Sequence, residues 1–102
     1  MVKKLTYIFD IDNTICTQEK EYVDAQPIPE HITKVNKKFD EGHTIIFWTS
    51  RGSTTGIDWT ELTKKQLKKW GVKYTELWMK KPPYDYWVDD KGRQPYDFFK
   101  YY

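Results

Sequence analysis

Short apolar segments that end in acids or hydroxyls, with helix-like segments between them, restrict this chain to few folds. Apolar and β-branched runs predict buried strands at 4–9, 43–48 and 86–90, which lead to Asp10, to Thr49 and to the pair Asp89 and Asp90. A chain that needed only a soluble surface would have no reason to collect such residues at three strand ends. The pattern therefore predicts an α/β fold whose chemistry gathers at one edge of a sheet.

Two helices are predicted between the strands. One begins near Pro29, because proline is tolerated in a first helical turn, and it stops at Gly42. The other runs from about Trp59 to Trp70. A short third strand is predicted at 74–78, and the aromatic tail from Pro95 to Tyr102 predicts a short helix that packs back on the body.

The alternation of strands and helices favours right-handed crossovers and a mainly parallel sheet, in a Rossmann-like three-layer sandwich. In such sheets ligands bind outside the carboxyl ends of the strands, which is where the acids and hydroxyls stand. The 102 residues fit one domain that covers 1–102.

Composition narrows the class of protein further. Cys16 is the single cysteine, so an internal disulfide is excluded and a reducing cytoplasm is favoured. No apolar run approaches the length of a membrane span and no signal-peptide pattern opens the chain, which predicts a cytoplasmic protein without a membrane partner. The net charge of +2 is mild, and only Arg51 and Arg93 of the 17 basic residues are arginines, so nucleic acid is not the expected partner.

Four acids carry the strongest chemical signal. Asp10 and Asp12 stand two residues apart directly after an apolar strand, where their carboxylates would repel one another, and Asp89 and Asp90 add to this repulsion. A hard dication relieves it, and Mg²⁺ prefers oxygen ligands and bridges to substrate phosphates. With the metal present, one aspartate can attack phosphorus, and the other can protonate the leaving oxygen and later deprotonate water.

Residues near the ends of the second and third strands could hold the transferred phosphoryl group. Its equatorial oxygens carry negative charge, so a hydroxyl, backbone amides and a lysine should surround it. Thr49, Ser50 and Lys81 are the candidates, with Lys80 as a rival to Lys81. For Arg51, substrate binding and a structural salt bridge stay open as alternatives.

These residues resemble the four motifs of the haloacid dehalogenase-like (HAD) phosphatase superfamily, in the order in which that family carries them. Ile8-Phe-Asp-Ile-Asp-Asn-Thr is similar to the first motif, and Ile45-Ile-Phe-Trp-Thr-Ser-Arg-Gly is similar to the second. Lys81 resembles the lysine of the third motif, and Trp87-Val-Asp-Asp resembles the acidic fourth. The resemblance covers the chain from about Leu5 to Asp90.

The resemblance implies a role for each matching position. Asp10 would be the nucleophile and a metal ligand, and Asp12 would be the general acid/base whose backbone carbonyl also binds the metal. Thr49 would bind the phosphate and Lys81 would stabilise its charge. The remaining Mg²⁺ ligands would be Asp89, bound directly, and Asp90, bound through water.

The resemblance also implies the strand order 3-2-1-4, because the family's first strand lies between its second and fourth. The segments in which relatives carry a cap domain are too short here, so a small capless member with an open site is expected. Asn13 stands where many members have glycine, and asparagine visits the left-handed conformation more easily than most residues. The implied function is Mg²⁺-dependent hydrolysis of a phosphate monoester, in a sugar phosphate, nucleotide, polysaccharide precursor or larger phosphorylated substrate.

Other interpretations stay open. Transfer of the phosphoryl group to an acceptor other than water would use the same aspartyl-phosphate, and a non-catalytic HAD-like module would hold phosphate or nucleic acid without turnover. An open site and an aromatic tail favour a homodimer. The loop at 53–58, together with Arg51, is predicted to contact the leaving group. Cys16 is predicted to be a small buried side chain, and His31 and His43 to be capping or surface residues.

Overall fold

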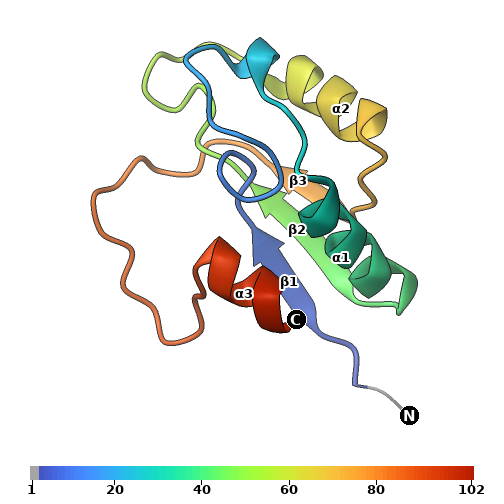
Figure 1. Ribbon diagram of the computed structural model, residues 1–102. Helices are drawn as coiled ribbons and strands as arrows, with labels where there is room; N and C mark the ends of the chain where they lie inside the picture. Colours follow the sequence, from blue (N-terminus) through green and yellow to red (C-terminus); the bar gives the residue numbers. More distant parts are fainter. Residues whose placement is uncertain (1–2) are drawn as a thin grey trace.

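The computed structural model describes residues 3–102, and its strands and helices alternate along the chain. The elements are β1 (Thr6–Phe9), the 3-10 helix η1 (Tyr22–Asp24), α1 (Pro29–Asp40), β2 (Thr44–Trp48), α2 (Thr60–Lys69), β3 (Glu76–Trp78) and α3 (Pro95–Tyr101). Figure 1 shows α1 and α3 in front of the sheet. The three predicted helices are confirmed, with bounds that differ from the expected ones by a residue or two.

The three strands form one parallel sheet in the order β1-β2-β3. Phe9 of β1 pairs with Phe47 of β2, and Trp48 of β2 pairs with Trp78 of β3. The crossovers through α1 and α2 both step the chain in the same direction across the sheet. Because right-handed connections that step the same way place their helices on the same face, α1 and α2 share one side. The carboxyl ends of all three strands meet at one edge, as predicted.

Local signals explain where α1 begins and ends. Pro29 lies in the first turn, where its missing N–H would have had no partner within the helix. After Asp40 the chain turns at Gly42, whose φ of 94° lies in the left-handed region that glycine adopts without strain. This turn leads directly into β2.

The hydrophobic core lies between the helices and one face of the sheet. It includes Phe9, Ile45 and Phe47 from the strands, and Ile32, Val35, Leu67 and Phe99 from the helices. Since side chains alternate between the faces of a strand, Phe9 and Phe47 point to the same face. Phe99 of α3 stacks on Phe9 and on His31, with ring centroids 5.9 Å and 4.1 Å apart, so the predicted packing of the aromatic tail on the body is confirmed.

The predicted third layer is not formed in the part of the chain that the structure describes. All three helices contribute side chains to the cluster around Phe47, so residues 3–102 form two layers rather than three. On the other face of the sheet Ile8 is 54% exposed. A helix on that face would have to lie between β3 and a fourth strand, and the seven residues 79–85 leave no room for one.

The predicted fourth strand at 86–90 is also not formed. We call residues 82–94 the arm; all of them are exposed and none belongs to a helix or strand. Figure 1 shows the arm looping away from the body before the chain returns at α3. A single extended segment gains nothing as a strand until a neighbour pairs with its N–H and C=O groups. The observed strands reproduce the first three places of the order 3-2-1-4, and the fourth is not confirmed.

Both histidines are buried, so of the two roles predicted for them, capping or surface, the surface role is wrong. His31 and His43 are each 8% exposed. The Nδ1 atom of His31 lies 2.7 Å from the carbonyl oxygen of Thr14, and Nδ1 of His43 accepts the N–H of Leu5 at 3.0 Å. Each ring ties an element to the loop or strand beside it, which is a structural role.

Candidate functional site

The loop after β1 places Asp10 and Asp12 at the carboxyl edge of the sheet. It turns tightly, because the N–H groups of Thr14 and Ile15 both donate to the carbonyl of Ile11 at 3.0 Å. Asn13 has a φ of 62°, which confirms the left-handed conformation predicted for it. The loop therefore presents two carboxylates where the sheet ends, as the first motif predicts.

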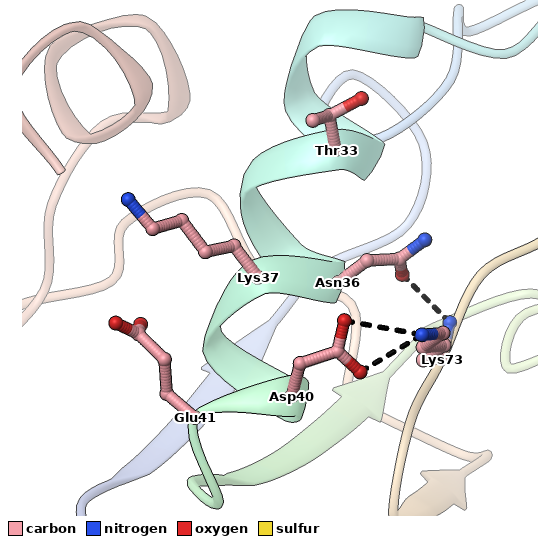
Figure 2. A pocket seen from close by; sticks show the side chains of 6 residues that line it. All are labelled: Thr33, Asn36, Lys37, Asp40, Glu41 and Lys73. Carbon is pink, nitrogen blue, oxygen red and sulfur yellow. Dashed lines mark hydrogen bonds and ion pairs between the residues drawn. The ribbon is translucent and has the colours of Figure 1, made fainter.

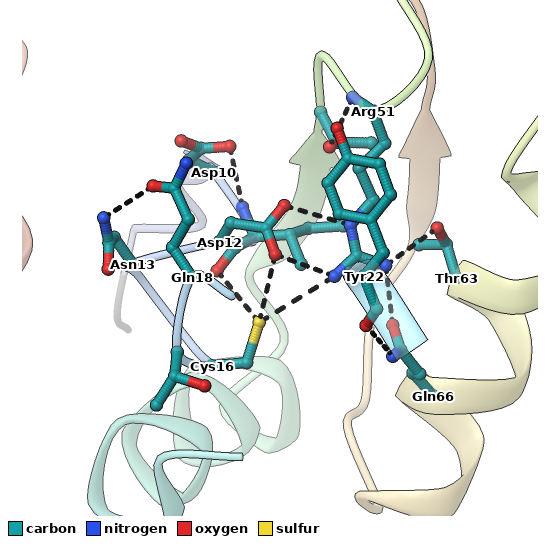
Figure 3. A network of polar contacts seen from close by, with 12 residues as sticks. Asp10, Asp12, Asn13, Cys16, Gln18, Tyr22, Arg51, Thr63 and Gln66 are labelled. Atoms are coloured by element: carbon teal, nitrogen blue, oxygen red, sulfur yellow. Dashed lines mark hydrogen bonds and ion pairs between the residues drawn. The ribbon is translucent and has the colours of Figure 1, made fainter. Parts of the chain in front are cut away.

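Arg51 holds the carboxylate of Asp12 from the loop after β2, as Figure 3 shows. Its Nη2 donates to Oδ1 at 2.8 Å and its Nε donates to Oδ2 at 3.0 Å, which is the forked geometry that a guanidinium offers to a carboxylate. Arg51 is 3% exposed. Of the two alternatives left open for Arg51, this arrangement is the structural salt bridge.

Three further residues fix the Arg51 guanidinium. Its Nη1 donates to Oε1 of Gln66 at 2.6 Å and to Oγ1 of Thr63 at 3.2 Å, and the ring of Tyr22 lies 4.9 Å from its central carbon. Burial lowers the pKa of Arg51, but the hydrogen bonds and charge of Asp12 outweigh this and raise the pKa above its ordinary value. The ion pair thus links the ends of β1 and β2, with Arg51 buried and Asp12 partly buried.

Sequence reasoning missed Tyr22, Thr63 and Gln66. A usable signal was present in α2, where Thr63 and Gln66 share a helical face with Leu67 and are 1% and 7% exposed. Two polar residues on the buried side of an amphipathic helix need buried hydrogen-bond partners. No comparable signal marks Tyr22, because its contact with Arg51 depends on how the loop before α1 folds.

Asp10 is held by the backbone and lies near a lysine. The N–H of Ile11 donates to its Oδ1 at 2.8 Å. Burial raises the pKa of Asp10 above its ordinary value, while the positive charge of Lys81 acts in the opposite direction. The negative charge of Asp12 also raises this pKa, so the two acids and Lys81 share one electrostatic environment.

Thr49 and Lys81 meet at this edge through the backbone. Thr49 is 1% exposed, and its carbonyl accepts the N–H of Lys81 at 3.0 Å. Its hydroxyl oxygen accepts the N–H of Arg51 at 3.1 Å. Ser50 is next in the chain and is exposed. The structure therefore brings Thr49 and Lys81 to the same edge as Asp10.

The side chains of Lys80 and Lys81 have different surroundings. Lys80 is exposed and has a φ of 65°, and its charge acts on Asp58, whose pKa is lowered first by hydrogen bonds from Thr60. The Nζ of Lys81 instead lies 5.3 Å and 5.2 Å from the ring centres of Tyr84 and Trp87. Since Lys81 is the lysine whose charge reaches Asp10, it fits the third-motif position better than Lys80.

Asp89 and Asp90 are not brought to the site. Both lie in the arm and are exposed. Asp89 accepts the N–H of Lys91 at 3.0 Å, and this bond leads the causes that lower its pKa. Within residues 3–102, no three His, Cys, Asp or Glu side chains gather closely enough to hold a metal ion. The predicted metal-binding set is therefore not assembled, because the strand that should carry its second half is not formed.

Two of the pockets on the surface of residues 3–102 lie in different places. Figure 2 shows the first, which is lined by polar residues of α1 and by Lys73, whose Nζ donates to Oδ1 of Asp40 at 2.8 Å. None of the predicted site residues lines it. The second lies among the loops after β2 and β3 and is lined in part by Arg51, Ser53, Asp58 and Lys80. This second pocket adjoins the candidate site.

Cys16 lies beneath Asp12 and is fully buried, as predicted. Its Sγ is 3.6 Å from Oδ1 of Asp12. Burial, followed by the charge of Asp12, raises the pKa of the thiol to about 12. A thiol with so high a pKa is not a nucleophile at neutral pH.

Known proteins place this geometry in context. A family described as "Mitochondrial PGP phosphatase" matches residues 2–89, a range that contains the first three motifs and the fourth as far as Asp89. A crystallised target protein from Vibrio cholerae has the same fold, with a TM-score of 0.83 and 23% identity over 95% of this chain and 88% of that chain. At this identity the likeness concerns the fold alone. No curated protein matches the sequence.

The observations say less about the cellular compartment of the protein than about its fold. No helix among residues 3–102 has the length and apolar character needed to cross a membrane. The description of the matching family contains the word "mitochondrial". The cytoplasmic location expected from the sequence therefore stays a prediction.

Proposed function

Because the chain belongs to the PGP phosphatase family of HAD-like phosphatases, we propose that it hydrolyses a phosphate monoester through an aspartyl-phosphate on Asp10. The observation that carries this proposal is the position of Asp10, a partly buried carboxylate at the carboxyl end of β1 on which the charge of Lys81 acts. A carboxylate that attacks phosphorus needs such a cation to offset the charge of the phosphoryl oxygens. Thr49 lies beside Lys81 and belongs to the same phosphate-binding group.

The reaction has two steps. In the first, an Asp10 oxygen forms a bond to phosphorus, the bond from phosphorus to the leaving oxygen breaks, and that oxygen takes a proton from Asp12. In the second, Asp12 removes a proton from water while the water oxygen attacks phosphorus. The bond to Asp10 then breaks, which releases inorganic phosphate and restores the carboxylate. Two residues thus provide one nucleophile and one proton carrier.

Arg51 holds Asp12 in place. Its two hydrogen bonds engage both carboxylate oxygens, so they fix the position from which Asp12 exchanges a proton with the leaving oxygen and with water. We therefore assign Arg51 the role of positioning Asp12 rather than of binding phosphate.

The residues present at the β1 end fit a magnesium ion. Asp10 and Asp12 offer oxygen atoms only, which Mg²⁺ prefers. Partial burial raises the pKa of Asp10 and so disfavours its charged form, and a cation beside it would offset this effect. Asp10 and the Asp12 carbonyl would hold the ion, together with Asp89 and Asp90 if these reach the site. When bound, Mg²⁺ would neutralise charge on the phosphoryl oxygens and orient them.

The substrate would enter where the two loops after β2 and β3 meet. Those loops line the second pocket, beside Arg51 and Lys80, so the leaving group would lie there. Without a cap domain the site is open, which allows a large leaving group. The name of the matching family makes PGP the first substrate to test.

Phosphate release from a panel of substrates tests the proposal. The panel contains PGP, sugar phosphates, nucleotides and an aryl phosphate, each with Mg²⁺ and with a chelator. We expect release that needs the metal and that falls at least about a thousandfold in Asp10→Asn, because the nucleophile is gone. Asp40→Asn is the matched control, since it removes only the exposed pair with Lys73 and should leave turnover unchanged. Release that survives Asp10→Asn would overturn the mechanism.

A further inference from the structure

Two of the four acids predicted for the site are absent from it, and both are exposed to solvent elsewhere in the same chain. Asp10 and Asp12 are in place at the end of β1, and Asp89 and Asp90 lie in the exposed arm. Tyr86 and Val88, which alternate with Trp87, are 89% and 95% exposed. Large apolar side chains of this alternating kind are usual in strands that have a neighbour.

The sheet has a free place for such a strand. β1 is the edge strand of the described sheet and pairs with β2 on one side only. An unpaired edge offers a row of N–H and C=O groups to another strand. α3 begins next to His31, at the same end of the sheet as Asp10, because the ring of Tyr96 lies 5.6 Å from that of His31. A strand that precedes α3 by four residues would therefore end at this edge, parallel to β1.

Within one copy of the chain the arm could reach this place only along a straight line, which the side chains of the sheet block. Lys81 is fixed to Thr49 at the carboxyl edge. Five residue steps separate Lys81 from Tyr86, and they span at most ~17 Å. A parallel strand beside β1 would have to start at the opposite end of the sheet, ~13 Å along the strands and ~10 Å across two strand spacings.

These two displacements combine to ~16 Å along a straight line through the sheet, and the chain has to go around the side chains instead. Parallel neighbours are accordingly joined by connections of about a dozen residues or more. The seven residues 79–85 are too few. Short connections under such strain favour the exchange of segments between copies.

A second copy removes the obstacle. A two-fold axis perpendicular to the sheet and beside β1 turns the partner sheet upside down, so that the partner's Lys81 lies at the end where the new strand must begin. The five residue steps from Lys81 to Tyr86 then have to cross only three strand spacings at one edge of the sheet. This distance is ~14 Å, and the five steps span up to ~17 Å. The two exchanged strands lie next to each other and antiparallel, which leaves neither free edge unpaired.

We propose that two copies of this chain exchange residues 86–102, so that each completes the other's sheet and site. Residues 86–90 of one copy pair with β1 of the other and place Asp89 beside Asp10 of that other copy. α3 moves with them onto the same α1 and β1 surface that it covers here. The inference rests on the proposed function for the role of Asp89, but its geometry does not depend on turnover.

The mass of the protein in solution gives a readout without activity. One chain has a mass of 12.4 kDa, and sedimentation should find twice this mass. Insertion of a six-residue Gly/Ser segment between Pro83 and Tyr84 should give a monomer, because the longer connection lets the strand close on its own β1. The same insertion between Lys91 and Gly92 is the matched control and should leave a dimer. A monomeric wild type, or an unchanged dimer after the first insertion, would overturn the exchange.

A heterodimer of two inactive variants tests which copy contributes each acid to a site. Asp10→Asn and Asp89→Asn, each inactive alone, are co-expressed with different tags and the heterodimer is isolated. Exchange predicts about half of the wild-type phosphate release, because one of the two sites then has both acids. No recovery would contradict the exchange while leaving the proposed function intact. A dimer that becomes a monomer on insertion but never releases phosphate would contradict the function alone.

Discussion

The two halves of the candidate site are built in opposite ways. At the β1 end, Asp12 is bound by Arg51, which is 3% exposed and contacts Thr63 and Gln66 of α2. In the arm, Asp89 and its neighbours are exposed and bind mainly to nearby residues of the same segment. The first half is assembled by buried contacts between elements that short crossovers bring together. The second half carries the right residues and touches the sheet through Trp87, whose ring centre lies 6.0 Å from that of Trp48, but it pairs with no strand of the described sheet.

A motif and its position in the fold are therefore separate properties. Both halves carry acids in the order expected of the family. The first half is held by Arg51, which is 3% exposed, and by the buried face of α2, whereas the arm is held at the sheet by Trp87, which is 50% exposed. The arm needs a strand beside it, and we infer that a second copy supplies this strand.

The largest effect on stability is expected where α3 packs after the arm. Phe99→Ala should lower the free energy of unfolding by about 4 kcal/mol, because it empties a buried site that stacks on Phe9 and His31. Urea unfolding at a fixed protein concentration measures this. Tyr101→Ala, at a site 72% exposed on the same helix, should change it by less than about 0.5 kcal/mol. Equal effects of the two variants would mean that α3 is not part of the core.

The next effect compares the two halves directly, with one arginine in each. Arg51→Met should cost about 3 kcal/mol of unfolding free energy, because Asp12 is left as a mostly buried charge without its partner. Arg93→Met, in the arm, should have almost no effect on stability, because Arg93 contacts only its neighbour Gly92 among the described residues. If both variants unfolded at the same urea concentration, the claim that the two halves are held differently would be contradicted.

A smaller effect follows from the raised pKa of Asp10. The folded state keeps the Asp10 proton to a higher pH than the unfolded chain does, so in that interval the folded state binds more protons. The free energy of unfolding then falls as pH rises from the ordinary Asp value of 3.8 through the raised pKa. Asp10→Asn lacks this loss, and without metal its stability relative to wild type should increase over the same interval. If the difference in unfolding free energy between the two proteins stayed constant with pH, burial would not be raising the pKa of Asp10.

Local patterns explain how much of the fold could be predicted. Pro29, Gly42 and the alternation around Phe47 act within a few residues of the elements they define, so the three helices and three strands follow from them. The end of a parallel strand is also the place where its loop begins, so Asp10, Thr49 and Lys81 could be assigned to one edge. The fourth strand could not be judged in this way, because pairing is a property of two segments and not of one.

The kind of chemistry and the edge of the sheet at which it gathers follow from local sequence, because both depend on which residues come after each apolar run. What holds Asp12 depends on the fold, since the contacts of Arg51 with Tyr22, Thr63 and Gln66 join segments far apart in the chain. The position of Asp89 depends on the fold as well. Whether residues 79–85 can connect β3 to a strand beside β1 depends on the distance between these two places. That distance is set only when the other strands are in position.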